Sequence, residues 1–304
     1  MIPIPLARFL LLCAVVIWGL TFVATKICLA YLSPLELLGL RLLIALPVML
    51  ALIAARRAPL SFRLPPRPVL LGSGLIGIHF YIQITGLKYT SATNTGWIIA
   101  VTPVVIALLS ALVLGERISP GLRTGIGVAT LGIFLLVSRG RLAELGWLTS
   151  LGDWLILASA HTWALYTIAV RDLARAENPL AVTFVLLLPA TIVATLVMAF
   201  TLSWERLLRL PLEAWLALLF LGVFGMALAH WFWQVGVARV GAARAGVFLY
   251  VEPLATTTLA VPYLGEPLGP TTIAGGGLVL LGVWIAQRSP GRGFRSWTSR
   301  GRAD

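Results

Sequence analysis

A glutamate followed by a proline lies in the middle of an apolar stretch near the end of the chain. Glu252 and Pro253 fall within the segment 241–264, in which Arg244 is the only other charged residue. A charged side chain at the centre of a membrane costs about 2.5–3.5 kcal/mol, so it needs a partner or a water-filled cavity. We interpret Glu252 as a group that binds a substrate amine, accepts a coupling proton or gates, or else forms a buried ion pair with Arg41, Arg244 or a histidine.

Two histidine–glutamine pairs occur at one spacing, one pair in each half of the chain. His79 is followed four residues later by Gln83, and His230 is followed by Gln234. Residues four apart lie on one face of a helix, and a polar face turned to lipid is costly. We therefore expect both faces to point inward, where the side chains either line a cavity or form hydrogen bonds between helices. Neither pair has a nearby acidic residue, so no metal site is predicted.

Aromatic residues predict a second wall for such a cavity. Trp18 and Trp163 are 145 residues apart, and Tyr166 lies one helical turn after Trp163. With Trp97, these rings could surround an amphipathic ligand and contact its amine through cation–π interactions. The alternative is that these rings serve only in ordinary packing or in a belt of aromatic residues at the membrane interface.

An arginine and two prolines complete the candidate residues. Arg41 lies in the first half of the apolar segment 34–55, where it either stabilises the helices or anchors a substrate carboxylate. Pro103 and Pro253 are 150 residues apart, and each is expected to kink its helix. The residue before Pro103 is the neutral Thr102, so the acidic group occurs in the second half alone.

The composition places these residues in a membrane protein. Hydrophobic residues make up 59% of the 304-residue chain and charged residues only 11%, against about 25% charged in an ordinary soluble domain. A spanning helix needs about 20 mostly apolar residues to cross the hydrocarbon core. Ten segments qualify: 9–30, 34–55, 69–87, 90–114, 120–138, 152–171, 179–202, 213–237, 241–264 and 270–287.

The second half of the chain repeats the pattern of the first. Residues recur after 145 positions early in the pattern and after 150 later: Trp18 with Trp163, Pro34 with Pro179, Gly86 with Gly236, Pro120 with Pro270, and Gly115-Glu116 with Gly265-Glu266. Each copy holds five segments, and because five is odd the copies lie in opposite orientations. The predicted fold class is an all-α integral membrane protein with ten transmembrane helices in two inverted-topology five-helix repeats, residues 8–138 and 150–287, before a basic cytoplasmic tail, residues 288–304.

The basic residues predict the orientation. The net charge is +12 at pH 7. With a cytoplasmic N-terminus, sixteen basic residues fall inside and five outside, in agreement with the positive-inside rule. The sixteen are Arg8, Arg56, Arg57, Arg63, Arg67, Arg117, Arg123, Arg171, Arg175, Arg239, Arg244, Arg288, Arg292, Arg295, Arg300 and Arg302. We predict a multi-pass protein of the inner (cytoplasmic) cell membrane with both termini cytoplasmic and the tail on anionic lipid. The first apolar segment is too long for a signal-peptide core, so we expect it to be retained.

Several motifs together carry a family resemblance. They are Trp18-Gly19 through Lys26, Ser33-Pro34, Arg41, Thr102-Pro103 and Leu114-Gly115-Glu116 in the first half, and Trp163, Gly241-Ala242-Ala243-Arg244-Ala245, Glu252-Pro253 and Leu264-Gly265-Glu266 in the second. The chain resembles an EamA-type member of the drug/metabolite transporter superfamily. The resemblance implies ten spans in an inverted arrangement and transport of small metabolites, commonly export of amino acids or related compounds. For Glu116 and Glu266 we favour a structural role at helix ends, with gating contacts as the alternative.

The expected function is therefore secondary transport by alternating access, around a cavity lined by spans one, three, four, six, eight and nine. The cargo is a small organic metabolite with an amine, such as an amino acid, with or without proton coupling through Glu252. A carrier of nucleotide sugars or other anions is the alternative, although few basic residues are available for it. Enzyme and channel functions are disfavoured, and no cofactor, metal or nucleic acid is expected. The fifth and tenth spans, poor in polar groups, serve as scaffold or as a homodimer contact.

Overall fold

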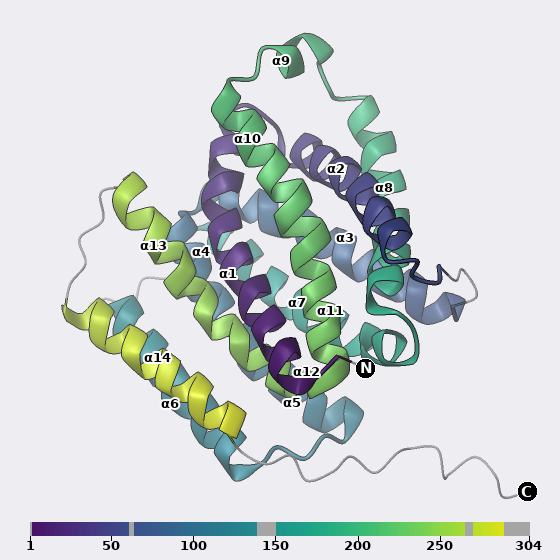
Figure 1. Ribbon diagram of the computed structural model, residues 1–304. Helices are drawn as coiled ribbons and strands as arrows, with labels where there is room; N and C mark the ends of the chain where they lie inside the picture. Colours follow the sequence, from purple (N-terminus) through teal and green to yellow (C-terminus); the bar gives the residue numbers. More distant parts are fainter. Residues whose placement is uncertain (1, 61–63, 139–149, 265–269, 289–304) are drawn as a thin grey trace, which may run out of the picture.

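The protein is a bundle of helices that form ten spans. The computed structural model describes residues 2–60, 64–138, 150–264 and 270–288. The first repeat consists of α1 (Ile4–Leu29), α2 (Pro34–Ala55), α3 (Pro66–Tyr89), α4 (Ala92–Ile99), α5 (Thr102–Leu114) and α6 (Pro120–Ser138). The second consists of α7 (Leu151–Ala176), α8 (Pro179–Ala199), α9 (Trp204–Leu208), α10 (Leu212–Phe220), the π-helix η2 (Leu221–Leu228), α11 (Ala229–Val240), α12 (Ala242–Gly246), the 3₁₀-helix η3 (Val247–Val251), α13 (Glu252–Leu264) and α14 (Pro270–Arg288) (Figure 1).

Ten spans follow when the interrupted helices are joined. The fourth span consists of α4 and α5, the eighth of α10, η2 and α11, and the ninth of α12, η3 and α13. The breaks in the fourth and ninth spans lie just before Thr102-Pro103 and Glu252-Pro253, and each proline is the second residue of the following helix. There the missing backbone donor costs no helical hydrogen bond. The predicted fold class is confirmed.

Length and composition explain why some spans are less obvious than others. Among the described residues, six helical stretches are long and apolar enough to cross a membrane, and α6 and α14 are shorter apolar helices. The 26-residue α7 carries the polar residues Asp153, Ser159, His161 and Thr162. Polar groups are thus concentrated in α7, the span of the second repeat that corresponds to α1 of the first.

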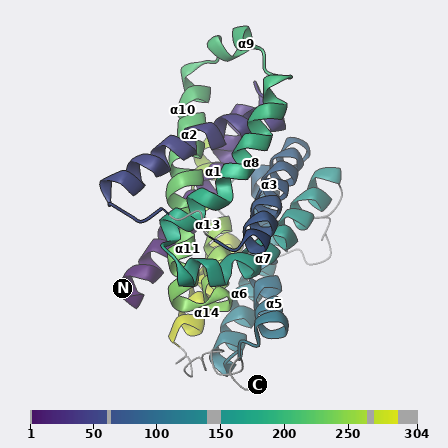
Figure 2. The ribbon, with the colours of Figure 1, turned by 90° about the vertical axis from the view of Figure 1, so that its right-hand side faces the viewer.

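The two repeats lie upside down relative to each other. Near the start of α1, Leu11 contacts Gly236, close to the end of α11. Near the end of α7, Arg175 lies beside Gly241, which directly follows α11. The start of α1 and the end of its counterpart α7 are therefore at the same end of the molecule, whereas α9 lies at the opposite end (Figure 2).

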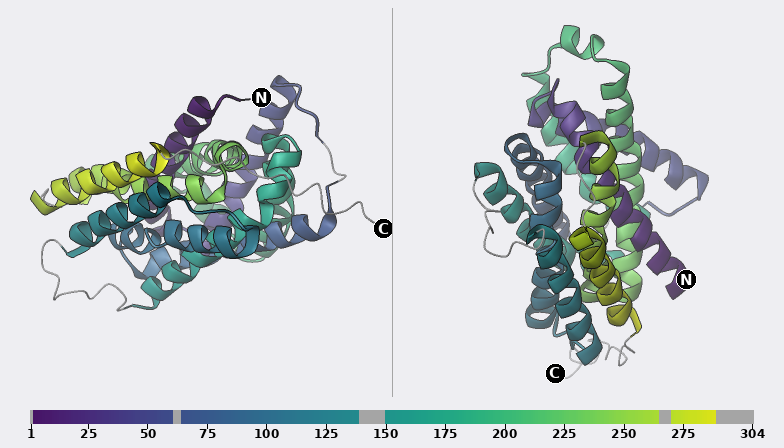
Figure 3. Two further views of the ribbon diagram at one scale, coloured as in Figure 1. Left: turned by 90° about the horizontal axis from the view of Figure 1, so that it is seen from below. Right: turned by 90° about the vertical axis from the view of Figure 1, so that its left-hand side faces the viewer.

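Helices pair across the two repeats. α7 packs against α3 of the first repeat, and α1 packs against α11 of the second. α6 and α14 pack against each other beside this centre (Figure 3). Glycines allow the closest approaches: a Cβ on Gly152 of α7 would lie 2.6 Å from the carbonyl oxygen of Gly86, and a Cβ on Gly19 of α1 would lie 2.6 Å from that of Glu252. α1 and the start of α13 are therefore in direct backbone contact.

Candidate functional site

A small cavity lies between the two repeats. The space in it that is open to a water-sized molecule is about 30 Å³, enough for one or two waters. Its walls come from the six predicted spans and also from α2. They are formed by Trp18, Thr21, Phe22, Arg41, His79, Phe80, Gln83, Ile99, Thr102, Ala160, Trp163, His230, Leu249 and Glu252. A metabolite larger than water requires the helices to separate.

Aromatic rings form one wall of the cavity. The ring centroids of Trp18 and Trp163 lie 4.9 Å apart with the planes at 82°, an edge-to-face arrangement that aromatic pairs favour. His230 packs 5.0 Å from Trp18, and His79 packs 5.0 Å from Trp163. Trp18 and Trp163, which correspond in the two repeats, therefore contact each other and a cavity histidine each.

Both cavity histidines are held by backbone carbonyls. Nδ1 of His79 lies 2.9 Å from the carbonyl oxygen of Ser159, and Nδ1 of His230 lies 2.9 Å from that of Gly225. Since a carbonyl oxygen can only accept, Nδ1 carries the hydrogen in each neutral ring and Nε2 is left as an acceptor. Nε2 of His230 is buried and has no hydrogen-bond partner among the described residues. The Gly225 carbonyl, within the π-helix η2, also accepts from Nε1 of Trp18 at 3.0 Å.

The cavity contains one cation and one acid, and they are not paired with each other. Arg41 is 3% exposed; its Nη2 contacts the sulfur of Met226 at 2.8 Å, and its guanidinium lies 4.5 Å from the centre of the Phe80 ring. Glu252 is 4% exposed, and its carboxylate has no hydrogen bond or ion pair with any described residue. The ion pair that the sequence left open for Glu252 is thus not formed within the described part of the chain.

Three of the predicted substrate-binding residues lie outside the walls of this cavity. Gln234 and Tyr166 are buried and bonded to each other, with Nε2 of Gln234 donating to the Tyr166 hydroxyl at 2.7 Å. Trp97 is half-buried and packs against a separate apolar cluster that includes Tyr250. Trp18, His79, Gln83, Trp163, His230, Arg41 and Glu252 do line the cavity.

Phe80 and Met226 both contact Arg41, although no sequence pattern singles out either residue. Phe80 follows the singled-out His79 directly, but an apolar aromatic residue in a spanning helix carries no signal of its own. Met226 lies in the π-helix η2, whose shifted register no pattern in the sequence predicts. Such π segments occur frequently at functional sites.

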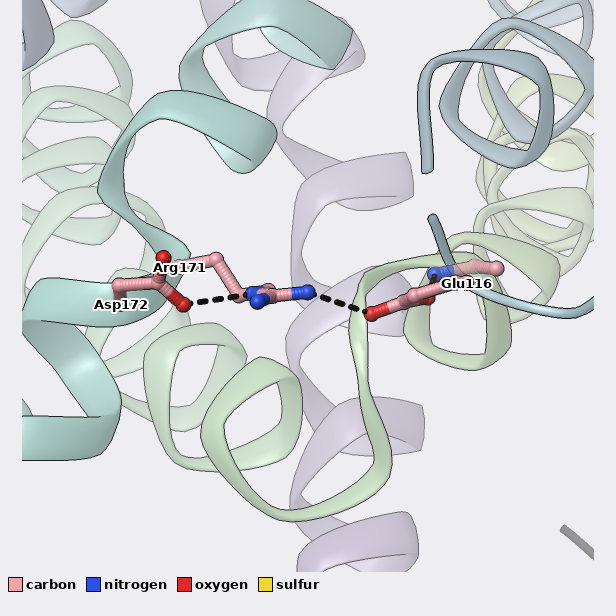
Figure 4. A network of polar contacts seen from close by, with 4 residues as sticks. Glu116, Arg171 and Asp172 are labelled. Carbon is pink, nitrogen blue, oxygen red and sulfur yellow. Dashed lines mark hydrogen bonds and ion pairs between the residues drawn. The ribbon is translucent and has the colours of Figure 1, made fainter. Parts of the chain in front are cut away.

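A polar network joins the two repeats at the end of the molecule where α1 begins. Nη1 of Arg171 lies 2.9 Å from Oε1 of Glu116, and its Nε lies 2.8 Å from Oδ1 of Asp172 (Figure 4). Oε2 of Glu116 also accepts from the backbone N–H of Ala243 at 3.5 Å. Glu116 therefore connects the end of the fourth span with the sixth and the ninth. Gly115, with φ of 62°, ends α5 in the left-handed conformation that favours glycine, whereas Gly265 and Glu266 lie outside the described residues.

A cavity at the interface of two inverted repeats of spanning helices, beside discontinuous helices, is the architecture of a secondary transporter. The family model described as the EamA-like transporter family matches residues 5–138 and 150–287. The chain belongs to this family, which is a family of multi-pass membrane transporters and not of enzymes.

Individual relatives cover nearly the whole chain at low identity. The chain is 28% identical to "Uncharacterized transporter YyaM" of Bacillus subtilis, over 88% of this chain and 89% of the relative. It is 26% identical to "Probable amino-acid metabolite efflux pump" of Salmonella typhimurium (91% and 93%) and 28% identical to "Aromatic amino acid exporter YddG" of Ancylobacter novellus (86% and 90%). A solved crystal structure, 23% identical, has a TM-score of 0.73 and covers 93% of this chain and 97% of its own, which is a likeness of fold.

Proposed function

We propose that the protein exports small amine-containing metabolites, with amino acids foremost, by alternating access around the cavity between its repeats. The observation that carries the proposal is the Glu252 carboxylate, which is buried at the cavity without a partner among the described residues. An acid held in this way requires a cation or a proton. A substrate ammonium group supplies that cation, and the rings of Trp18 and Trp163 supply faces for cation–π contacts.

The relatives support the same class of cargo. Two of them carry names that refer to amino-acid export, at 26% and 28% identity over most of both chains. A carrier of nucleotide sugars would need several cations for the phosphates, but Arg41 is the only arginine or lysine among the cavity residues of the described chain. The cavity therefore favours an amine over a polyanion.

Glu252 is also our candidate for proton coupling. It faces a cavity whose other titratable and charged groups are His79 on α3, His230 on α11 and Arg41 on α2. Protonation of the carboxylate would release a bound amine, because the neutral acid no longer attracts the cation. Substrate and proton would then compete for one group, which is the simplest form of exchange coupling.

The distribution of basic residues supports an orientation with both termini cytoplasmic in the inner membrane. The basic tail, residues 288–304, falls largely outside the described residues. The homodimer predicted through the fifth and tenth spans stays a prediction.

Transport by the purified protein in proteoliposomes tests the proposal. We expect saturable uptake of a labelled amino acid that responds to an imposed pH gradient, and we expect Glu252→Gln to abolish that response. Glu213→Gln serves as a matched control, because Glu213 is an exposed glutamate in the first turn of α10 and does not line the cavity. Uptake of nucleotide sugars in place of amines, or an intact pH response in Glu252→Gln, would refute this assignment.

A further inference from the structure

The cavity holds a buried arginine whose charge no acidic side chain among the described residues balances. Arg41 is 3% exposed, lies on α2 and lines the cavity. Its Nη2 contacts only a thioether sulfur, a weak acceptor, and its Nε has no partner among the described residues. A guanidinium presents five donors in a planar fork that matches a carboxylate, and most of that capacity is unused here.

The acid that could neutralise Arg41 faces the same cavity without bonding to it. Glu252 comes from α13 of the second repeat, whereas Arg41 comes from α2 of the first. A buried charge without a partner costs more free energy than the same charge in a bonded pair. Arg41 and Glu252 each carry this cost while the cavity holds no ligand. A molecule that carries both an ammonium and a carboxylate group satisfies both charges at once.

We propose that Arg41 binds the carboxylate of the substrate, so that the protein selects zwitterionic amino acids and rejects the corresponding amines. This deepens the proposed function, on which it rests, because Glu252, which lines the same cavity, then takes the ammonium group. The Phe80 ring, 4.5 Å from the guanidinium, holds Arg41 in place through a cation–π contact. The Met226 sulfur is the contact that the carboxylate replaces.

The proposal also says which repeat holds each end of the substrate. A substrate bound through both ends would bridge the first repeat at Arg41 and the second at Glu252. An amine without a carboxylate would reach only the second repeat and would leave Arg41 unsatisfied. Selectivity therefore follows from an unpaired buried group, which rejects ligands that lack its partner more strongly than an apolar wall does.

The test compares amino acids with their decarboxylated counterparts on the detergent-purified full-length protein. The probes are L-phenylalanine and phenethylamine, L-leucine and 3-methylbutylamine, and L-lysine and cadaverine, with binding measured by calorimetry. For each pair in which the amino acid binds, we expect the wild type to bind it about 10- to 100-fold more tightly than the amine. This is the range for losing a hydrogen bond to a charged group. Arg41→Met should remove this preference while amine affinity is unchanged, and Arg41→Lys should keep part of it. Arg123→Met, an exposed arginine on α6, is the control.

The outcomes separate the two proposals. If the wild type binds amines as tightly as amino acids, or if Arg41→Met weakens both classes equally, Arg41 is structural and this inference is wrong while amine transport stands. If no amino acid and no amine is bound, the proposed function itself fails and the inference with it. The wild-type comparison needs no variant, so it can refute the inference even if Arg41→Met does not fold.

Discussion

The carboxylate of Glu116 lies 2.9 Å from the guanidinium of Arg171 and joins the end of the fourth span to the sixth, across the interface between the repeats. A second oxygen of the same carboxylate accepts from the first turn of α12. Three spans that contribute to the cavity are thus connected at the end of the molecule where the chain begins. We propose that this contact helps to hold this end of the transporter closed, which is the gating role left open for Glu116 beside its helix-end role.

Breaking this ion pair should open that end of the protein more often. We expect Glu116→Gln to raise the labelling rate of a cysteine introduced at Thr102, in the cavity wall, by about 5- to 10-fold, as a shift of about 1 kcal/mol between two states produces. The background would be a chain with Cys13 and Cys28 replaced by alanine. The exchanged pair Glu116→Arg with Arg171→Glu should restore slow labelling, and Glu213→Gln, at an exposed position on α10, should leave it unchanged. A labelling rate that Glu116→Gln does not alter would assign the pair to helix-end stability alone.

The two cavity tryptophans should respond differently to loss of their indole N–H. Nε1 of Trp18 donates to the Gly225 carbonyl at 3.0 Å, whereas Nε1 of Trp163 is buried without a partner among the described residues. Trp18→Phe should therefore lower the free energy of unfolding by about 0.5–1.5 kcal/mol more than Trp163→Phe. Denaturation in detergent, followed by circular dichroism, measures the difference. Equal losses would mean that the Trp18 bond contributes nothing to stability.

The hydrogen bond between Gln234 and Tyr166 should matter for stability and not for substrate choice. Tyr166→Phe leaves the buried amide of Gln234 without its acceptor, which should cost about 1–3 kcal/mol of unfolding free energy. Gln234→Leu added to Tyr166→Phe should recover part of that loss, because two apolar groups then face each other. Substrate preference in the binding assay should be unchanged in both variants. A changed preference would place this pair in the binding site.

Gly152 should tolerate no side chain. A Cβ there would lie 2.6 Å from the Gly86 carbonyl oxygen and 2.8 Å from the backbone of Tyr89, so α3 and α7 would have to separate. We expect Gly152→Ala to lower the free energy of unfolding by about 1–3 kcal/mol, the range for overpacking. Gly127→Ala is the matched control, since a Cβ at Gly127 would meet nothing within 4 Å. Equal melting temperatures for the two variants would show that the helices adjust freely.

Much of the architecture could be predicted from the sequence, because a lipid bilayer permits few backbone conformations. Lipid offers no hydrogen-bond partners, so apolar segments of sufficient length must be helices, and prolines mark where they are interrupted. The predicted spans 34–55 and 120–138 coincide with α2 and α6, and the breaks before Pro103 and Pro253 lie where the repeat placed them. The odd number of spans in each copy required the inversion. The same cost of polar groups in lipid singled out Glu252, Arg41 and both histidines.

Only the tertiary structure decided which polar groups meet. His79 and Gln83 both line the cavity, yet of the equivalent pair His230 lines it and Gln234 does not. His230 lies on α11 just after the π-helix η2, whereas Gln234, one turn further along α11, is bonded to Tyr166 of α7. The separation of Arg41 from Glu252 is likewise a matter of packing between helices far apart in the chain. A sequence states that a buried charge needs a partner, but only the packed helices determine whether the protein or its substrate provides it.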